Sequence, residues 1–321
     1  MSWALTAFLA LSVAFFMDRM CEARGLLPPG FREPWRRVTA WALVALVLWI
    51  GAFASLASGG GAGEPVERDL SQLTTPQLFL LHFLLVLTIV SWFLLGFAGV
   101  RPDTVRVRSL DVGEGLAPSR AGASPAPTLA PEANSIEVRP APAPAPPPVP
   151  LLRRFQEQFG FVAPDLPREI GIGVLVGVGS WGAVLAVVIA IGLLIMALGG
   201  EDSLPKQPPA LIPWIVALPV GVRILISLSA GVVEETFFRG FLQPRIGIFL
   251  STLLFVFAHF SYGQPFMLIG IGTLSLIYAF LVRWRQNIWP AIAAHTLFDA
   301  VQLLFIIPAA LKYMEKAGAG N

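Results

Sequence analysis

Long apolar runs alternate with short polar breaks along this chain, and they set the expected fold. A bilayer core about 30 Å thick needs about 20 mostly apolar residues in one helix. Eight runs approach this length: 2–17, 39–58, 77–100, 170–199, 211–241, 246–261, 264–282 and 288–311. The pattern predicts an all-α protein, a polytopic transmembrane helical bundle of about eight spans in which 2–17 is a retained span.

The composition also indicates a membrane protein. Hydrophobic residues make up 55% of the 321 residues, charged residues make up 13%, and the mean hydropathy is +0.72. Ordinary soluble domains contain about 25% charged residues, so this composition excludes a soluble globular enzyme. It also excludes a wholly disordered chain, which needs low hydrophobicity. A net charge of +2 gives no case for nucleic acid as a partner, and we expect the lipid bilayer instead.

Arginines in the breaks predict the orientation, because positively charged loops stay in the cytoplasm. Residues 18–38 carry five arginines and residues 101–108 carry three, whereas residues 59–76 carry three acidic residues and one arginine. We therefore expect the segments 18–38 and 101–169 to face the cytoplasm.

A proline- and alanine-rich segment interrupts the apolar runs. It contains 11 prolines between Leu116 and Pro150, and this composition favours an extended polyproline-II spacer without a core. We predict three parts: an N-terminal three-span membrane module at 1–100, a disordered cytoplasmic linker at 101–169 and a membrane domain at 170–321.

The densest cluster of charges within an apolar run is GVVEETFFRGFL. It carries Glu234, Glu235 and Arg239, and charged residues inside a span mark functional or structurally paired sites. Glu235 and Arg239 are four residues apart, so they share a helix face and can pair. Glu234 points about 100° away from Glu235, which leaves it free to face another group.

Histidines supply the other candidate groups. His259 follows Phe255 by one helical turn in an apolar stretch. His295 and Asp299 are four residues apart, a spacing that suits a metal half-site, an oriented base or a helix hydrogen bond. His82 has no acidic neighbour in sequence, and we interpret it as structural or interfacial.

Three motifs together carry a family resemblance. EETFFR at 234–239, FVFAH at 255–259 and HTLFD at 295–299 occur in this order on successive apolar helices. This order resembles the CPBP family of intramembrane glutamic endopeptidases, also called Abi or CAAX prenyl protease type 2 (Ras-converting enzyme) proteins. The similarity covers about 210–305, so the first three spans and the linker lie outside it.

The resemblance implies an intramembrane endopeptidase that works without a metal or cofactor, in a bacterial plasma membrane. Its substrate would be a membrane-associated protein or peptide, either prenylated or a peptide precursor. Carried over to this sequence, Glu234 is the general base that activates water, assisted by His259. His295 and Asp299 stabilise the oxyanion. The supporting residues implied by the same motifs are Glu235, Arg239 and Phe255.

Asp299 departs from the usual pattern, because prenyl-protein proteases usually have Asn at this position. An ionised Asp cannot donate a hydrogen bond to an oxyanion. It would instead accept from His295 and fix the tautomer of that ring.

Two rival interpretations stay open. One is a zinc-dependent membrane metalloprotease with Glu234, His259 and His295 as ligands, although the sequence lacks His-Glu-x-x-His. The other is a non-catalytic membrane interaction or immunity protein of the same fold.

Overall fold

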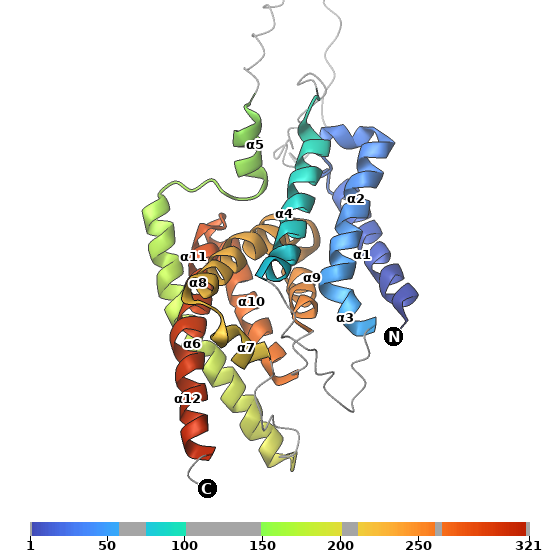
Figure 1. Cartoon of the computed structure of the whole chain (residues 1–321). Helices are drawn as coiled ribbons and strands as arrows, with labels where there is room; N and C mark the ends of the chain where they lie inside the picture. Colours follow the sequence, from blue (N-terminus) through green and yellow to red (C-terminus); the bar gives the residue numbers. More distant parts are fainter. Residues whose placement is uncertain (1, 58–74, 101–148, 201–210, 261–264, 319–321) are drawn as a thin grey trace, which may run out of the picture. The chain divides into compact units, whose positions relative to one another are not determined.

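The computed structural model describes residues 2–57, 75–100, 149–200, 211–260 and 265–318, and all regular elements in these ranges are helices (Figure 1). The expected all-α membrane bundle is confirmed. The helices before the gap at 101–148 are α1 (Trp3–Ala23), α2 (Pro34–Leu48), α3 (Ala54–Ala57) and α4 (Thr75–Phe97). Those after it are α5 (Leu151–Gln158), α6 (Leu166–Ala197), α7 (Leu211–Ala217), α8 (Val220–Ser229), α9 (Gln243–Ala258), α10 (Pro265–Arg285), α11 (Trp289–Val301) and α12 (Ile307–Gly318). Most of the predicted linker therefore lies outside the described residues.

Seven helices in the described part of the chain are long and apolar enough to cross a membrane. They are Trp3–Ala23, Pro34–Phe53, Pro76–Phe97, Leu166–Ala197, Val220–Ala258, Met267–Arg285 and Trp289–Lys316. The chain is therefore an integral membrane protein. The count is one lower than the eight runs of the sequence, because the runs expected at 211–241 and 246–261 are joined in the single stretch Val220–Ala258.

The chain reverses its direction within this joined stretch, which therefore consists of two helical segments. In a straight α-helix, Glu234 and His259 would lie about 38 Å apart, because each residue adds about 1.5 Å. Instead, Oε2 of Glu234 lies 4.0 Å from Nε2 of His259. Gly247, between them, has φ 85° and ψ 172°, a conformation that a residue without Cβ adopts readily. The bend brings two of the sequence motifs to one place.

The helices on either side of the 101–148 gap share one hydrophobic core. α4 packs against the turns that follow α8, and α1 packs against α9. Trp92 of α4 lies 5.2 Å from Phe241 between ring centroids, and Cζ of Arg245 lies 4.3 Å from the centre of the Trp92 ring. These contacts unite the described residues of both segments in one compact unit. The three-part division of the sequence stays a prediction.

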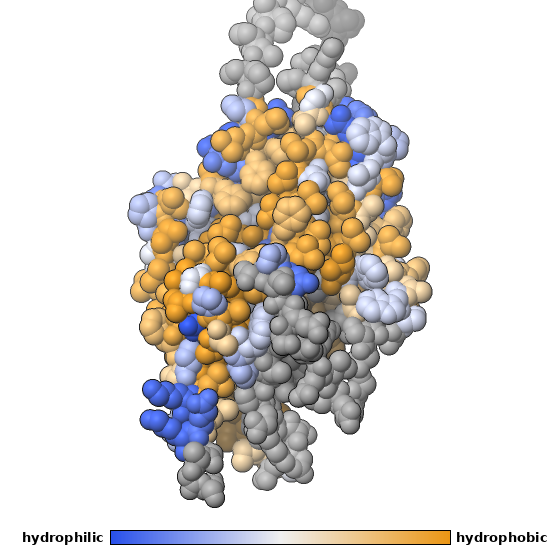
Figure 2. All heavy atoms as spheres, viewed as in Figure 1, coloured by the Kyte–Doolittle hydropathy of each residue, from blue (hydrophilic) through white to orange (hydrophobic). Residues whose placement is uncertain are grey.

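Outward-facing side chains are apolar over much of the surface. Figure 2 shows a largely apolar face with hydrophilic residues gathered at its upper and lower ends. On α6, for example, Leu175, Val178 and Leu185 are exposed. Apolar patches of this extent are rare on soluble monomers and are expected where lipid covers the protein.

Arginines beside the helix ends make contacts within the described unit. Arg24, which follows α1, donates to the carbonyl of Arg245 at 3.4 Å. Arg285, at the end of α10, pairs with Glu169 near the start of α6 at 2.5 Å. These contacts do not test the orientation, which stays a prediction.

Candidate functional site

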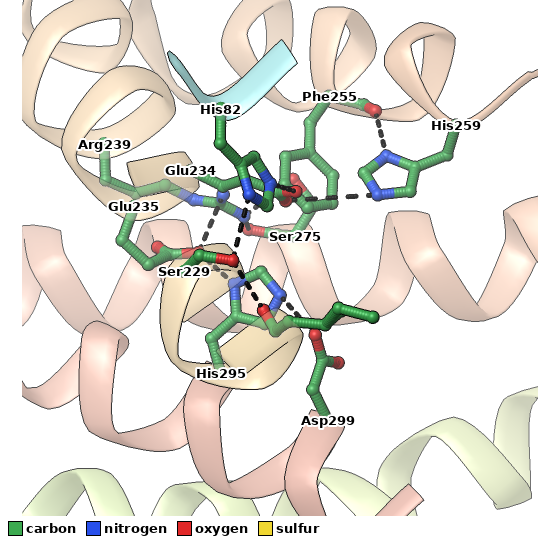
Figure 3. Close-up of polar contacts among 11 residues, drawn as sticks. His82, Ser229, Glu234, Glu235, Arg239, Phe255, His259, Ser275, His295 and Asp299 are labelled. Atoms are coloured by element: carbon green, nitrogen blue, oxygen red, sulfur yellow. Dashed lines mark hydrogen bonds and ion pairs between the residues drawn. The ribbon is translucent and has the colours of Figure 1, made fainter. Parts of the chain in front are cut away.

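The candidate site lies where α4, α9, α11 and the π-helical turns that follow α8 come together. It contains all three histidines of the chain (Figure 3). The helix after α8 is π-helical at Ala230–Glu234 and again at Thr236–Leu242. π-Helical turns are rare in proteins and frequent at functional sites. Glu234 and Glu235 lie at the junction of these two segments, so the widened turns carry both carboxylates.

Glu235 and Arg239 form a buried ion pair. Their side chains are 0% and 1% exposed, and Nη1 of Arg239 lies 3.0 Å from Oε1 of Glu235, without the alignment of a hydrogen bond. Nη2 of Arg239 donates to the carbonyl and the hydroxyl of Ser275 on α10, at 3.2 and 3.1 Å. The Phe255 ring centre lies 4.4 Å from Cζ of Arg239, a cation–π distance. The pair thus ties this helix to α9 and α10.

His295 of α11 lies between two carboxylates. Its Nδ1 is 2.8 Å from Oε1 of Glu235, and its Nε2 is 3.5 Å from Oδ2 of Asp299. An ionised carboxylate can only accept hydrogen bonds, so the ring donates wherever it bonds one of these oxygens. The Asp299 side chain is 28% exposed and that of His295 is 9% exposed. Nε2 is therefore the ring nitrogen on the more open side.

Glu234 faces a different histidine with each of its carboxylate oxygens. Nε2 of His82 lies 3.2 Å from Oε1, and Nε2 of His259 lies 4.0 Å from Oε2. Within the described residues, Oε2 is buried and has no hydrogen-bond partner. The Glu234 side chain is 15% exposed, so this first glutamate is more accessible than Glu235.

The orientation of His259 is fixed by the main chain of its own helix. Nδ1 lies 2.8 Å from the carbonyl oxygen of Phe255, which can only accept, so Nδ1 carries a hydrogen. In the neutral ring the other nitrogen, Nε2, is then a hydrogen-bond acceptor. This acceptor is the atom that faces Glu234. Phe255 also packs against the ring, with centroids 4.6 Å apart.

Gly231 sets the spacing between the glutamate-bearing turns and α11. A Cβ at this position would collide with Oγ1 of Thr296 and lie 3.0 Å from the carbonyl oxygen of Ile292. Thr296 is the neighbour of His295, and Gly231 lies three residues before Glu234. A residue without a side chain therefore permits the close approach that brings the first and third motifs together.

The ligands of the rival zinc interpretation do not share a centre in this arrangement. Glu234 and His259 are close, but both ring nitrogens of His295 face other carboxylates. Within the described ranges, no group of three His, Cys, Asp or Glu side chains is arranged to hold a metal ion. This geometry does not fit a zinc ion bound by Glu234, His259 and His295.

Two contacts of the site are absent from the sequence interpretation. His82, which we interpreted as structural or interfacial, bonds Glu234, and its Nδ1 lies 3.0 Å from the Ser229 hydroxyl. The hydroxyl oxygen of Ser275 accepts a hydrogen bond from the Arg239 guanidinium. The sequence does contain a signal for His82, because an ionisable residue inside an apolar span is by default a functional candidate. Its partner depends on the packing of α4.

Comparison with known proteins agrees with the resemblance of the three motifs. Residues 211–301 match the family model described as type II CAAX prenyl endopeptidase Rce1-like. The chain is also 33% identical over 79 residues to the Bacillus subtilis (strain 168) protein named "Uncharacterized protein YpbD". That match covers 24% of this chain and 42% of the relative, so it spans less than half of the relative's length. No solved structure matches the chain.

Proposed function

We propose that this protein, in which residues 211–301 form a CAAX protease (CPBP) type domain, is an intramembrane endopeptidase that uses Glu234 to activate water. One observation carries the proposal. Oε2 of Glu234 is a buried carboxylate oxygen without a hydrogen-bond partner among the described residues, and it faces Nε2 of His259 at 4.0 Å.

The two facing atoms suit the activation of one water molecule. Both Oε2 of Glu234 and Nε2 of His259 are hydrogen-bond acceptors, and a single water can donate one hydrogen to each. Its lone pairs then point away from both residues, toward a substrate carbonyl carbon. A general base in this position typically contributes about 10²- to 10⁴-fold to the rate.

The reaction is an ordinary peptide-bond hydrolysis. The water oxygen bonds to the carbonyl carbon as one of its protons passes to Glu234. The carbonyl oxygen becomes an oxyanion, to which Nε2–H of His295 donates in place of its contact with Asp299. Such donors, fixed in a site with little water, are worth several kcal/mol. Collapse of the intermediate breaks the C–N bond, and Glu234 returns the proton to the leaving nitrogen.

The roles of the remaining residues are structural in this proposal. Glu235 accepts from Nδ1 of His295 and pairs with Arg239, which orients the ring and holds the helix. Asp299 lies 3.5 Å from the opposite nitrogen, as an ion-pair partner, and keeps the ring in place between turnovers. No step requires a metal ion, because the carboxylate and two imidazoles supply the base and the oxyanion donor.

The substrate class follows from where the site lies and from the description of the matched family. Glu234, His259 and His295 belong to apolar helices, so a membrane-associated protein or peptide is the substrate that reaches them. A prenylated peptide with a CAAX-type end is one such substrate, and an unmodified membrane peptide precursor is another.

A cleavage assay on the purified full chain in detergent tests the proposal. The probes are an internally quenched farnesylated peptide with a CAAX-type end and the same peptide without the lipid. We expect cleavage of at least one probe, and Glu234→Gln should lower kcat by at least about 10²-fold because the general base is lost. Gln keeps the size of the side chain, so folding should be retained.

Two results would contradict the proposal in different ways. If folded wild-type protein leaves both peptides intact, the substrate class is wrong. If Glu234→Gln retains wild-type turnover, the role of Glu234 as the base is wrong.

A further inference from the structure

His82 lies outside the segment that matches the family, yet it contacts the central glutamate. It belongs to α4, which packs against both π-helical segments. The span Pro76–Phe97 contains no Asp, Glu, Lys, Arg, Tyr or Cys, so the His82 imidazole is its one titratable side chain. A titratable group inside a membrane span is costly unless it has a partner. Among the described residues, both polar partners of His82 belong to the helix that carries Glu234.

The hydrogen bonds of Ser229 define how His82 is used. The Ser229 hydroxyl donates to the carbonyl of Ile226 at 3.0 Å, which takes up its one hydrogen. Its oxygen, 3.0 Å from Nδ1 of His82, therefore accepts from Nδ1–H. The other ring nitrogen, Nε2, lies 3.2 Å from Oε1 of Glu234.

This second contact requires a proton. A bare ring nitrogen and a carboxylate oxygen both present lone pairs, and they would repel each other at this distance. One proton therefore lies between Nε2 and Oε1, and it belongs to the ring when Glu234 is the ionised base proposed above. Oε1 is thereby engaged, which leaves Oε2 as the oxygen that faces His259.

We propose that His82 is a positioning residue that holds Glu234 by Oε1 and orients Oε2 toward His259. This inference rests on the proposed function of Glu234 as the base. It also gives the N-terminal segment a part in the chemistry, because α4 supplies a hydrogen bond that the Rce1-like segment cannot make by itself.

Two substitutions of His82 and one matched control test this role in the full chain. His82→Ala removes the bond, whereas His82→Gln can place an amide N–H near Oε1. Leu85→Ala is the control, because Leu85 is a buried residue of α4 in the shared core and makes no polar contact with the site.

The first readout is independent of substrate. Glu234→Gln removes one carboxyl absorption from the infrared spectrum, and that difference identifies the band of Glu234. We expect His82→Ala to shift this band and Leu85→Ala to leave it in place. A band that is the same in His82→Ala and wild-type protein would overturn the inference.

The second readout is the kinetics with whichever of the two peptides described above the wild-type protein cleaves. His82→Ala should lower kcat by about 10- to 100-fold, the range for one lost hydrogen bond to a charged group, with little change in KM. His82→Gln should recover part of this loss, and Leu85→Ala should keep the wild-type kcat. Equal kcat in His82→Ala and wild-type protein, together with an inactive Glu234→Gln, would reject the role of His82 alone. An active Glu234→Gln would instead reject the proposed function.

Discussion

The buried Glu235–Arg239 pair offers a sharp test of how the site is held together. Glu235→Gln removes one negative charge and leaves the shape of the side chain almost unchanged. Arg239 would keep its bonds to Ser275 and its contact with Phe255, but it would lose its anionic partner at 3.0 Å. The variant therefore isolates the charge of Glu235.

The expected cost is large because the guanidinium is almost inaccessible to water. The Arg239 side chain is 1% exposed, so solvent cannot replace the lost carboxylate. Removing one partner of a buried ion pair typically costs about 3–5 kcal/mol. This corresponds to a change of about 10²- to 10⁴-fold in the unfolding equilibrium constant. Nδ1–H of His295 can still donate to the Gln side-chain oxygen, so that contact contributes little to the loss.

Equilibrium unfolding in mixed detergent micelles, followed by circular dichroism, measures this cost. A double-mutant cycle supplies the control: Glu235→Gln, Arg239→Met and the double variant are compared with wild-type protein. Replacing both members of a buried pair by neutral residues is often nearly neutral, so the double variant should be more stable than the sum of the single losses predicts. Glu234→Gln, at a side chain 15% exposed, should be much less destabilising.

Two outcomes would refute this reasoning. If Glu235→Gln unfolds at the same denaturant fraction as wild-type protein, the pair does not stabilise the fold. If the losses of unfolding free energy in the two single variants simply add up in the double variant, the two side chains act independently and the 3.0 Å contact does not contribute to stability.

Two further predictions concern the spacing of the helices and the metal. Gly231→Ala should destabilise the protein by about 1–3 kcal/mol through overpacking against Thr296, and it should lower kcat. Gly221→Ala is the control, because its added Cβ meets nothing within 4 Å, and it should have neither effect. Equal effects of both substitutions in unfolding and cleavage assays would contradict the close-approach argument. Peptide cleavage should survive exhaustive treatment with a strong chelator, and elemental analysis should find well under one zinc per chain. Activity that is lost on chelation and restored by zinc would instead favour the metalloprotease, in which the metal itself would activate the water.

The sequence was sufficient for the fold class because lipid imposes a simple rule. Each span needs about 20 apolar residues, and the runs of this chain meet that need with few ambiguities. The resemblance to the matched family was also recognisable, since Glu234, His259 and His295 occur in motifs whose order can be read without any knowledge of packing. The i, i+4 spacing likewise anticipated a pair between Glu235 and Arg239, because one helical turn separates them.

Other features depend on geometry that sequence periodicity does not encode. We assumed a regular α-helix through Glu234 and Glu235, whereas the structure has π-helical turns on both sides of Glu235. The reversal at Gly247 could not be distinguished from a break between two spans, because glycine suits both. His82 was visible as the one titratable side chain of its span, but its partner is 152 positions away and depends on how α4 packs.

The two adjacent glutamates have different roles in the proposed mechanism: Glu235 holds the structure, and Glu234 takes part in the chemistry. Glu235 has Arg239 and His295 on one oxygen and is 0% exposed, so its side chain is engaged with two buried partners and shielded from water. In the described part of the chain, the ionic partners of Glu234, one residue earlier, are the imidazoles of His82 and His259, and its side chain is 15% exposed. A general base must be approached by the reacting water, and at 15% exposure against 0% Glu234 is the more accessible of the two carboxylates. Glu234 is therefore the residue expected to take the proton during hydrolysis.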